Sequence, residues 1–184
     1  MARTTADDST GPRPIRVLFV CTGNICRSPT AEGVFAHLAA ERGAGERFVV
    51  DSAGTGGWHI GSLPDPRTRA VAEARGVPLT SRARQLEPAR DFPDPATDPR
   101  GRGFDHLIAA DLDHVDHMVR LGGPRERISL LRAHDPALHG RPEVELETPD
   151  PYYGDDAGFE RCYDVIEQAC LGLLNTLLDS VDAR

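Results

Sequence analysis

One short segment of this 184-residue sequence combines residues that could bind and attack an oxyanion. Cys21 and Arg27 are separated by five residues, namely Thr22, Gly23, Asn24, Ile25 and Cys26. Successive backbone N–H groups of such a segment can curl into a nest that binds an anion. Arg27 can hold two oxygens of that anion at once, which a point charge cannot do. We therefore expect this segment to form an oxyanion cradle.

Cys21 is the candidate nucleophile of the cradle. A helix N-terminus and a nearby cation stabilise a thiolate, so we expect an anionic sulfur that faces the bound oxyanion. The hydroxyl of Ser28 could hydrogen-bond this sulfur and help it leave. Gly23 and Asn24 tolerate the left-handed backbone that a nest needs. The alternative is a cysteine that merely ends a strand, and it leaves the spacing, the arginine and the glycine unexplained.

The cradle needs a strand before it and a helix after it. Residues 15–20 form a short β-branched and aromatic run that is typical of a buried strand. Ser28 at the cap and Pro29 in the first turn suit the start of a helix, and Gly43 suits its end. The open end of a parallel strand is where an α/β sheet binds ligands.

The same alternation of strand and helix continues along the chain. Further strand-like runs lie at 48–50, 106–110 and 127–131, and helical patterns follow Pro66, begin near Leu112 and cover 157–178. On the helix after Pro66, the expected buried face carries Ala70, Val71 and Ala74. The pattern predicts an α/β fold in a single domain: a doubly wound, Rossmann-like, four-stranded parallel sheet with helices on both faces.

Composition limits the domain organisation and the location. Residues 1–14 are predicted to be a flexible tail, residues 15–184 one domain, and the Pro-, Asp- and Arg-rich residues 91–103 an inserted surface loop. Residues 1–14 lack the apolar stretch of a secretory signal, and no apolar run approaches membrane-spanning length. Four cysteines in such a chain indicate free thiols in a reducing, cytoplasmic compartment, with no membrane partner.

Charge and residue usage exclude several functions. The net charge of −8 provides no basic surplus for neutralising phosphates, so we expect no nucleic-acid partner. All 21 basic residues are arginine. Without lysine the chain cannot form a Walker-A loop, a Schiff base or a lysine general base.

The motif around the cradle resembles a known family. Residues 20–32, which read VCTGNICRSPTAE, are similar to the signature of the low-molecular-weight protein tyrosine phosphatases. The resemblance continues in order through residues 51–55, 57–61 and 150–154, and it covers nearly the whole chain from Ile15 onward.

The resemblance implies a phosphatase that needs no metal and no cofactor and acts on tyrosine-phosphorylated proteins. Cys21 would attack phosphorus and form a phosphocysteine, while Arg27 and the cradle amides would hold the equatorial oxygens. Asn24 would hold the loop in its conformation. Asp150 would protonate the leaving phenolate and later activate water, on a loop stiffened by Pro151.

The residues outside the cradle have simpler alternatives. An Asp-Pro pair such as Asp150 and Pro151 commonly begins a turn. Trp58, Tyr152 and Tyr153 could form the walls of a cleft for an aryl phosphate or could be ordinary core residues. For Tyr153 the two interpretations are equally good, whereas Trp58 lies in a Gly-rich loop, which favours the cleft.

The three other cysteines also allow two interpretations. Cys26 could form a reversible disulfide with Cys21 that protects the nucleophile, or it could be a small packing residue of the loop. Cys162 and Cys170 lie along the apolar stripe of the last helix and are expected to fill the core.

The chain departs from the family at Arg75, where a histidine is common. Either Arg75 replaces the usual polar support of the Asn24 region, or that support is absent.

The run DLDHVDH at residues 111–117 suggests two other kinds of site. It mimics the nucleophile motif of haloacid-dehalogenase-type phosphatases, and its acidic and histidine residues could bind a metal. We expect it instead to begin a helix whose acidic residues lie at the positive end.

Two rival functions stay open. An arsenate reductase can use the same fold and oxyanion loop, but it would need a further redox cysteine pair near the loop. A silent module that binds phosphotyrosine or sulfate would need neither Cys21 nor Asp150 for chemistry. The sequence names no substrate protein and no oligomeric state, and it does not say whether Tyr152 or Tyr153 is itself phosphorylated.

Overall fold

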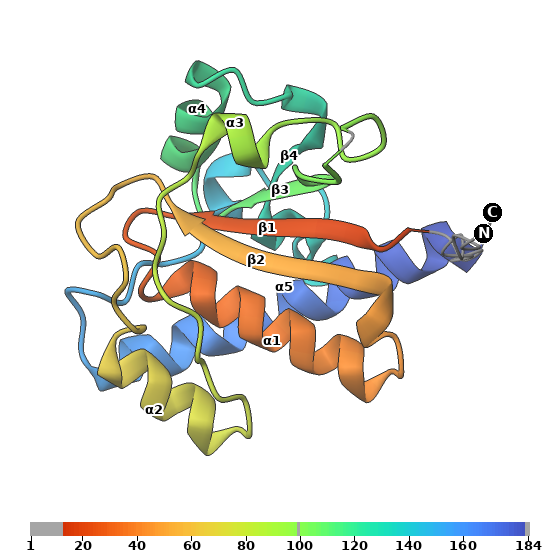
Figure 1. Cartoon of the computed structure of the whole chain (residues 1–184). Helices are drawn as coiled ribbons and strands as arrows, with labels where there is room; N and C mark the ends of the chain where they lie inside the picture. The colour runs from red at the N-terminus through yellow and green to blue at the C-terminus, as the bar shows by residue number, and fades with distance from the viewer. Residues whose placement is uncertain (1–12, 99, 183–184) are drawn as a thin grey trace, which may run out of the picture.

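A parallel four-stranded sheet forms the centre of the computed structural model, which describes residues 13–98 and 100–182. Its strands are β1 (Ile15–Cys21), β2 (Phe48–Gly54), β3 (His106–Ala109) and β4 (Ile128–Leu130). They lie in the order β2-β1-β3-β4 (Figure 1). The strand order reverses at β1, so the chain that leaves the carboxyl end of β1 lies at the switch point of the sheet.

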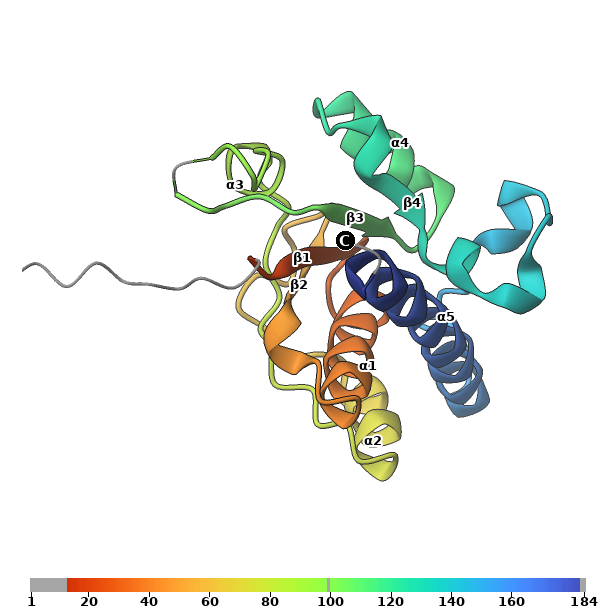
Figure 2. The ribbon, with the colours of Figure 1, turned by 90° about the vertical axis from the view of Figure 1, so that its right-hand side faces the viewer.

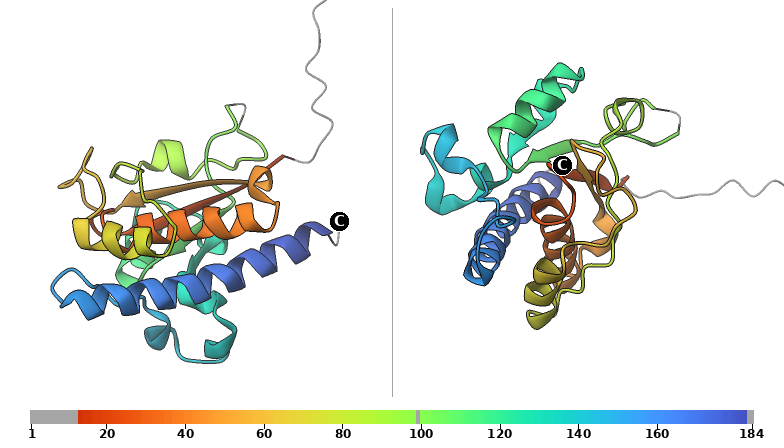
Figure 3. Two further views of the ribbon diagram at one scale, coloured as in Figure 1. Left: turned by 90° about the horizontal axis from the view of Figure 1, so that it is seen from below. Right: turned by 90° about the vertical axis from the view of Figure 1, so that its left-hand side faces the viewer.

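Helices cover both faces of this sheet, as the sequence pattern predicts. On one face lie α1 (Arg27–Glu41), α2 (Pro66–Ala74) and the long α5 (Asp156–Asp182), and on the other lie α3 (Pro88–Asp91) and α4 (Leu112–Arg120) (Figure 2, Figure 3). The doubly wound α/β fold is confirmed.

The alternation of side chains along β1 explains why two layers of helices are needed. Val17 and Phe19 pack into the core between the sheet and the helices α1 and α5. Leu18 and Val20 pack into the core on the opposite face, between the sheet and α4. Successive strand residues point to opposite faces, so a central strand that is apolar on both must be covered twice. Phe35 of α1 meets the ring of Phe19 at 5.9 Å between centroids.

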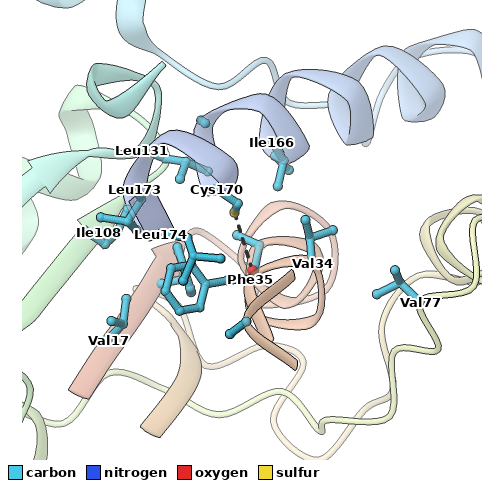
Figure 4. Packing of buried hydrophobic residues seen from close by; sticks show 14 of the residues in the cluster. Val17, Val34, Phe35, Val77, Ile108, Leu131, Ile166, Cys170, Leu173 and Leu174 are labelled. Carbon is cyan, nitrogen blue, oxygen red and sulfur yellow. Dashed lines mark hydrogen bonds between the residues drawn. The ribbon is translucent and has the colours of Figure 1, made fainter. Parts of the chain in front are cut away.

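The buried stripe of α5 seals the first of these cores. Six residues along this stripe are buried, namely Phe159, Cys162, Ile166, Ala169, Leu173 and Leu177. In the packed cluster Ile166 projects toward α1, and Leu173 lies beside Ile108 of β3 (Figure 4). Cys170 lies in the same core, and its thiol points at the carbonyl oxygen of Ala31, 3.6 Å away. Cys162 and Cys170 therefore fill the core, as expected.

Two details of the helices differ from the sequence prediction. Helix α1 begins two residues earlier than predicted, with Cys26 as its cap residue, so Ser28 lies inside the first turn and is not the cap. The hydroxyl of Ser28 contacts the Cys21 thiol instead. On α2 the fully buried residues are Thr68 and Ala72, whereas Ala70 and Ala74 are exposed, because the helix lies on α5 with a different face.

The predicted loop over 91–103 is anchored more firmly than expected. Asp91 is the last residue of α3 and is completely buried, where it pairs with Arg84 at 2.9 Å. Arg127 donates to the backbone carbonyls of Phe92 and Phe104. The segment leads into β3, so it lies at the amino end of the sheet, away from the cradle (Figure 1).

Two further sequence predictions concern the N-terminal tail and membrane-spanning segments. Residues 1–12 of the expected tail lie outside the described residues, so the boundary between tail and domain stays a prediction. Within the described part of the chain, no helix is both long and apolar enough to cross a membrane.

Candidate active site

The cradle forms the turn between β1 and α1, and Asn24 fixes its shape. Asn24 has a φ of 55°, in the left-handed region that asparagine tolerates. Its amide group donates to Ser28 Oγ at 2.9 Å and to Ser52 Oγ at 2.8 Å. Its Oδ1 accepts the backbone N–H of Arg84 at 2.9 Å. Because Asn24 is 2% exposed, these bonds hold the loop from beneath.

The support of Asn24 does not involve Arg75. The guanidinium of Arg75 instead pairs with Glu160 and Asp164 on α5 and lies over the ring of Tyr163. Arg75 therefore ties α2 to α5, and of the two alternatives for this position, replacement of the family histidine by Arg75 is wrong.

Cys21 ends β1 at the floor of the pocket. Its Sγ lies 3.0 Å from Ser28 Oγ. The residue is 3% exposed, yet it lines the pocket together with the backbone of the cradle. The pocket gives access to this sulfur, and the Ser28 hydroxyl is in position to stabilise its anion.

Arg27 is the buried cation of the site. Its Nη1 donates to Asp111 Oδ2 at 2.8 Å, and its Nη2 donates to Asp150 Oδ2 at 2.9 Å. Burial would lower the pKa of Arg27, but the charges of Cys21, Asp150 and Asp111 outweigh burial and hold its pKa above the ordinary value. A fixed positive charge therefore lies beside the thiol.

A pocket of about 370 Å³ brings the predicted residues together. Ten of them line it, namely Cys21, Thr22, Gly23, Ile25, Cys26, Arg27, Trp58, Asp150, Tyr152 and Tyr153. Asn24 and Ser28 do not line the pocket and lie beneath it. His59 also lines the pocket, although the sequence analysis did not predict it as a site residue. The one sequence feature that could have indicated this role is its position next to Trp58.

The aromatic residues form the rim of this pocket. Trp58 is 76% exposed and Tyr153 is 94% exposed, so neither is a core residue. Tyr152 and Tyr153 meet edge to face, with ring centroids 4.9 Å apart. Large apolar side chains left this exposed around a buried thiol indicate a binding rim.

Asp150 is both a turn residue and a pocket residue. Its Oδ1 accepts the backbone N–H of Tyr152 at 3.1 Å, which is the hydrogen bond expected of an aspartate that begins a turn. Its Oδ2 faces Arg27, and the side chain is 44% exposed. A carboxyl group thus stands over the cradle with access to solvent.

Cys26 lines the pocket as a buried free thiol. Burial raises the pKa of Cys26 to about 12. A disulfide between Cys21 and Cys26 stays a prediction.

Sequence reasoning missed the part that Asp111 and His114 play in the site. Asp111 caps α4, as expected of a helix start, but its carboxylate also holds Arg27. His114 is 3% exposed and reaches Thr22 of the cradle. Among the residues that the structure describes, no cluster of three or more metal-ligating side chains occurs.

Comparisons with known proteins agree with this geometry. The sequence model of the family Low molecular weight phosphotyrosine protein phosphatase matches residues 16–183. A protein of Streptomyces coelicolor named low molecular weight protein-tyrosine-phosphatase is 43% identical, over 92% of this chain and 97% of its own length. Low molecular weight protein-tyrosine phosphatase A of Mycobacterium tuberculosis is 42% identical, over 87% of this chain and 90% of its own.

Comparison with solved structures also finds a protein tyrosine phosphatase. The crystal structure of a protein tyrosine phosphatase from Entamoeba histolytica, with Hepes in the active site, matches with a TM-score of 0.76 and 32% identity. The match covers 90% of this chain and 98% of that one.

Proposed function

This chain belongs to the low molecular weight phosphotyrosine protein phosphatase family, and we propose that its pocket hydrolyses phosphotyrosine through a phosphocysteine. One observation carries the proposal. Cys21, Arg27 and Asp150 line a single pocket, with the thiol at its floor and the carboxyl group above the cradle. A nucleophile, an oxyanion clamp and a proton donor are the three groups that the reaction requires.

The first step transfers the phosphoryl group to sulfur. The thiolate of Cys21 attacks phosphorus, an S–P bond forms, and the bond from phosphorus to the phenolic oxygen breaks. Asp150 gives its proton to that oxygen, so tyrosine leaves as a neutral phenol. In the second step water attacks phosphorus, Asp150 takes a proton from the water, and the S–P bond breaks to release phosphate and the thiolate.

Arg27 links substrate binding to the release of Asp150. Its Nη2 donates to Asp150 Oδ2, while its Nη1 is held by Asp111. An equatorial phosphoryl oxygen that takes the Nη2 donor replaces the carboxylate there. Asp150 is then free to turn toward the leaving oxygen, and Asp111 keeps the guanidinium in place.

The depth of the pocket supports a tyrosyl substrate. Cys21 is buried at the floor, whereas the rings of Trp58 and Tyr153 are exposed at the rim. A phosphate on a long, flat aryl group can reach the sulfur while its ring stacks against the rim. A phosphate on the short side chain of serine would bring the substrate backbone against the rim first.

The proposed partner is a tyrosine-phosphorylated protein, and the proposed location is the cytoplasm. Four free cysteines support a reducing compartment. Fractionation of cells that express the full chain tests the location, and recovery of the protein in an oxidising compartment would contradict it.

The test of the function is hydrolysis of a phosphotyrosine peptide in the presence of EDTA. We expect wild-type activity to survive chelation and Cys21→Ser to abolish it. In Asp150→Asn the general acid is lost, so kcat should fall about 10²- to 10⁴-fold while a phosphoenzyme still forms. Asp155→Asn is the matched control, because Asp155 is an exposed aspartate of the same loop and should change kcat less than about 2-fold.

Other outcomes would assign the site differently. Activity that requires magnesium, or that persists in Cys21→Ser, contradicts the thiolate mechanism. Arsenate-dependent oxidation of thiols would favour the arsenate reductase, and tight phosphopeptide binding without turnover would favour the silent module.

A further inference from the structure

Arg67, in the first turn of α2, joins the loop of Asp150 to the body of the protein. Its Nη2 donates to the backbone carbonyl of Tyr152 at 3.3 Å. The guanidinium lies over the ring of Phe159 at 4.3 Å from the centroid, and 5.9 Å from the centroid of the Tyr152 ring. Arg67 does not line the active-site pocket, and the two steps of phosphoryl transfer give it no role.

The same arginine is tied to the cradle through Asp65. Asp65 is the cap residue of α2, and its carboxylate accepts Arg67 Nε at 3.1 Å and Arg67 Nη2 at 3.0 Å. These hydrogen bonds from Arg67 hold the pKa of Asp65 below its ordinary value, so Asp65 is ionised at neutral pH. The backbone N–H of Asp65 donates to the carbonyl oxygen of Ile25 in the cradle at 2.8 Å. Arg67 is therefore held in place relative to the cradle.

Tyr152 connects Arg67 to the general acid. Its backbone N–H donates to Asp150 Oδ1 at 3.1 Å, while its carbonyl oxygen accepts Arg67. In the described part of the chain, the other hydrogen bonds and ion pairs of residues 151–155 stay within their own turn or reach α5. Arg67 is thus the polar link between this stretch of the loop and α2.

This link becomes important when substrate binds. In the proposed reaction a phosphoryl oxygen takes the Nη2 donor of Arg27 away from Asp150. The carboxyl group then keeps its hydrogen bond to the N–H of Tyr152, and Tyr152 is held in turn by Arg67. A misplacement of about 1 Å in a catalytic group can cost about 100-fold in rate, so this support matters for the transfer of the proton.

We propose that Arg67 is a positioning residue for the general acid, and that it holds the Asp150 carboxyl group at the correct place over the cradle during phosphoryl transfer. The inference rests on the proposed function, because it requires Asp150 to protonate the leaving oxygen. Arg67 itself transfers no proton and forms no covalent bond in the reaction.

The dependence of the rate on the leaving group tests this role. Phenyl phosphate releases a weakly acidic phenol and needs a proton from Asp150, whereas 2,4-dinitrophenyl phosphate releases a stable anion that needs none. In Arg67→Gln we expect kcat/KM for phenyl phosphate to fall about 10-fold and kcat/KM for the dinitrophenyl ester to change less than about 2-fold. This parameter covers the steps up to phenol release and excludes hydrolysis of the phosphocysteine.

The ratio of the two kcat/KM values is the quantity to compare. It does not depend on the fraction of the enzyme that is folded, so a loss of stability in Arg67→Gln does not imitate the expected result. Arg69→Gln is the matched control, because Arg69 is an exposed arginine of the same helix. The control should keep the ratio within about 2-fold of wild type.

A double-mutant cycle shows whether Arg67 acts through the carboxyl group of Asp150. The general acid is absent in Asp150→Asn, so adding Arg67→Gln to this variant should lower kcat/KM for phenyl phosphate by less than about 2-fold. A purely structural role of Arg67 would instead give the same loss in both backgrounds.

Two results would overturn the proposal, namely an unchanged ratio in Arg67→Gln and a further loss of about 10-fold in the Asp150→Asn background. Failure of the proposed function gives a different pattern. If Asp150→Asn alone leaves the ratio at its wild-type value, Asp150 is not the general acid and the proposed function fails as well. If Asp150→Asn lowers the ratio and Arg67→Gln does not, only the role of Arg67 fails.

Discussion

Arg27 lies between two carboxylates that differ in their surroundings. Asp111 is held by Arg27 and His114 and is 20% exposed, whereas Asp150 is 44% exposed and, among the described residues, hydrogen-bonds only to Arg27 and its own turn. The first is therefore suited to hold the guanidinium in place, and the second is suited to move. Two residues of the same type, both aspartate, thus have different roles, because their burial and their partners differ.

We expect the contribution of Asp111 to stability to depend on pH. Its pKa is lowered in the folded state, so its stabilising effect is fully present above its ordinary pKa of about 3.9 and is lost as pH falls toward the folded value. In urea unfolding at pH 7, Asp111→Asn should lower the free energy of unfolding by about 2 kcal/mol. The difference from wild type should shrink below about pH 4.

Asp113→Asn is the matched control for this measurement. Asp113 is exposed in the first turn of the same helix, so its loss should cost less than about 1 kcal/mol. A cost for Asp111→Asn that stays constant from pH 7 to below pH 4 would contradict the lowered pKa.

At the scale of elements, α5 is fixed by close backbone contact with the turn Leu131–His134. Gly172 lies in the middle of α5, and a Cβ there would come within 1.9 Å of the carbonyl oxygen of His134. A Cβ is fixed to the helix backbone and the obstructing oxygen belongs to the backbone of His134, so no side-chain rotation can relieve the clash. The turn continues from β4, and α5 is thereby placed against the end of the sheet.

Gly172→Ala should therefore destabilise the protein although alanine favours helices. We expect the free energy of unfolding to fall by about 3 kcal/mol in chemical denaturation followed by circular dichroism. Gly158→Ala in the first turn of α5 is the control, since its Cβ would meet nothing closer than 3.5 Å. The control should be neutral or stabilising by up to about 1 kcal/mol. Equal effects of the two substitutions would contradict the close contact.

At the scale of the whole molecule, the fold places Cys21 in a different chemical environment from Cys162 and Cys170. Cys21 opens into the pocket at the switch point of the sheet. Cys162 and Cys170 are enclosed between α5 and α1, and burial raises the pKa of both thiols, that of Cys162 to about 12. Position in the fold, rather than residue type, distinguishes the nucleophile from the core residues.

Alkylation of the native protein with iodoacetamide near pH 7.5 should show this sorting. We expect Cys21 to react first and to be protected by inorganic phosphate. Cys162 and Cys170 should react at least about 10³-fold more slowly, at the rate of global unfolding. Mass spectrometry of peptides from wild type and Cys21→Ser identifies the sites. Rapid labelling of Cys162 while the circular dichroism spectrum stays native would contradict the packing.

The sequence by itself determined the cradle and the class of fold. The spacing from Cys21 to Arg27 implies a nest, and period-two and helical patterns imply strands and helices, because both depend on neighbours along the chain. The buried stripe of α5 and the left-handed Asn24 could be predicted for the same reason.

Only the tertiary structure decided what surrounds Arg27. Asp111 and His114 lie 84 and 92 residues from their cradle partners Arg27 and Thr22. Their sequence pattern is that of an ordinary helix start, and local spacing carries no information on which distant charge they meet. The place of Tyr153 at the exposed rim and the ion-pair partners of Arg75 were likewise open, because burial and ion pairing depend on how elements pack across the sheet.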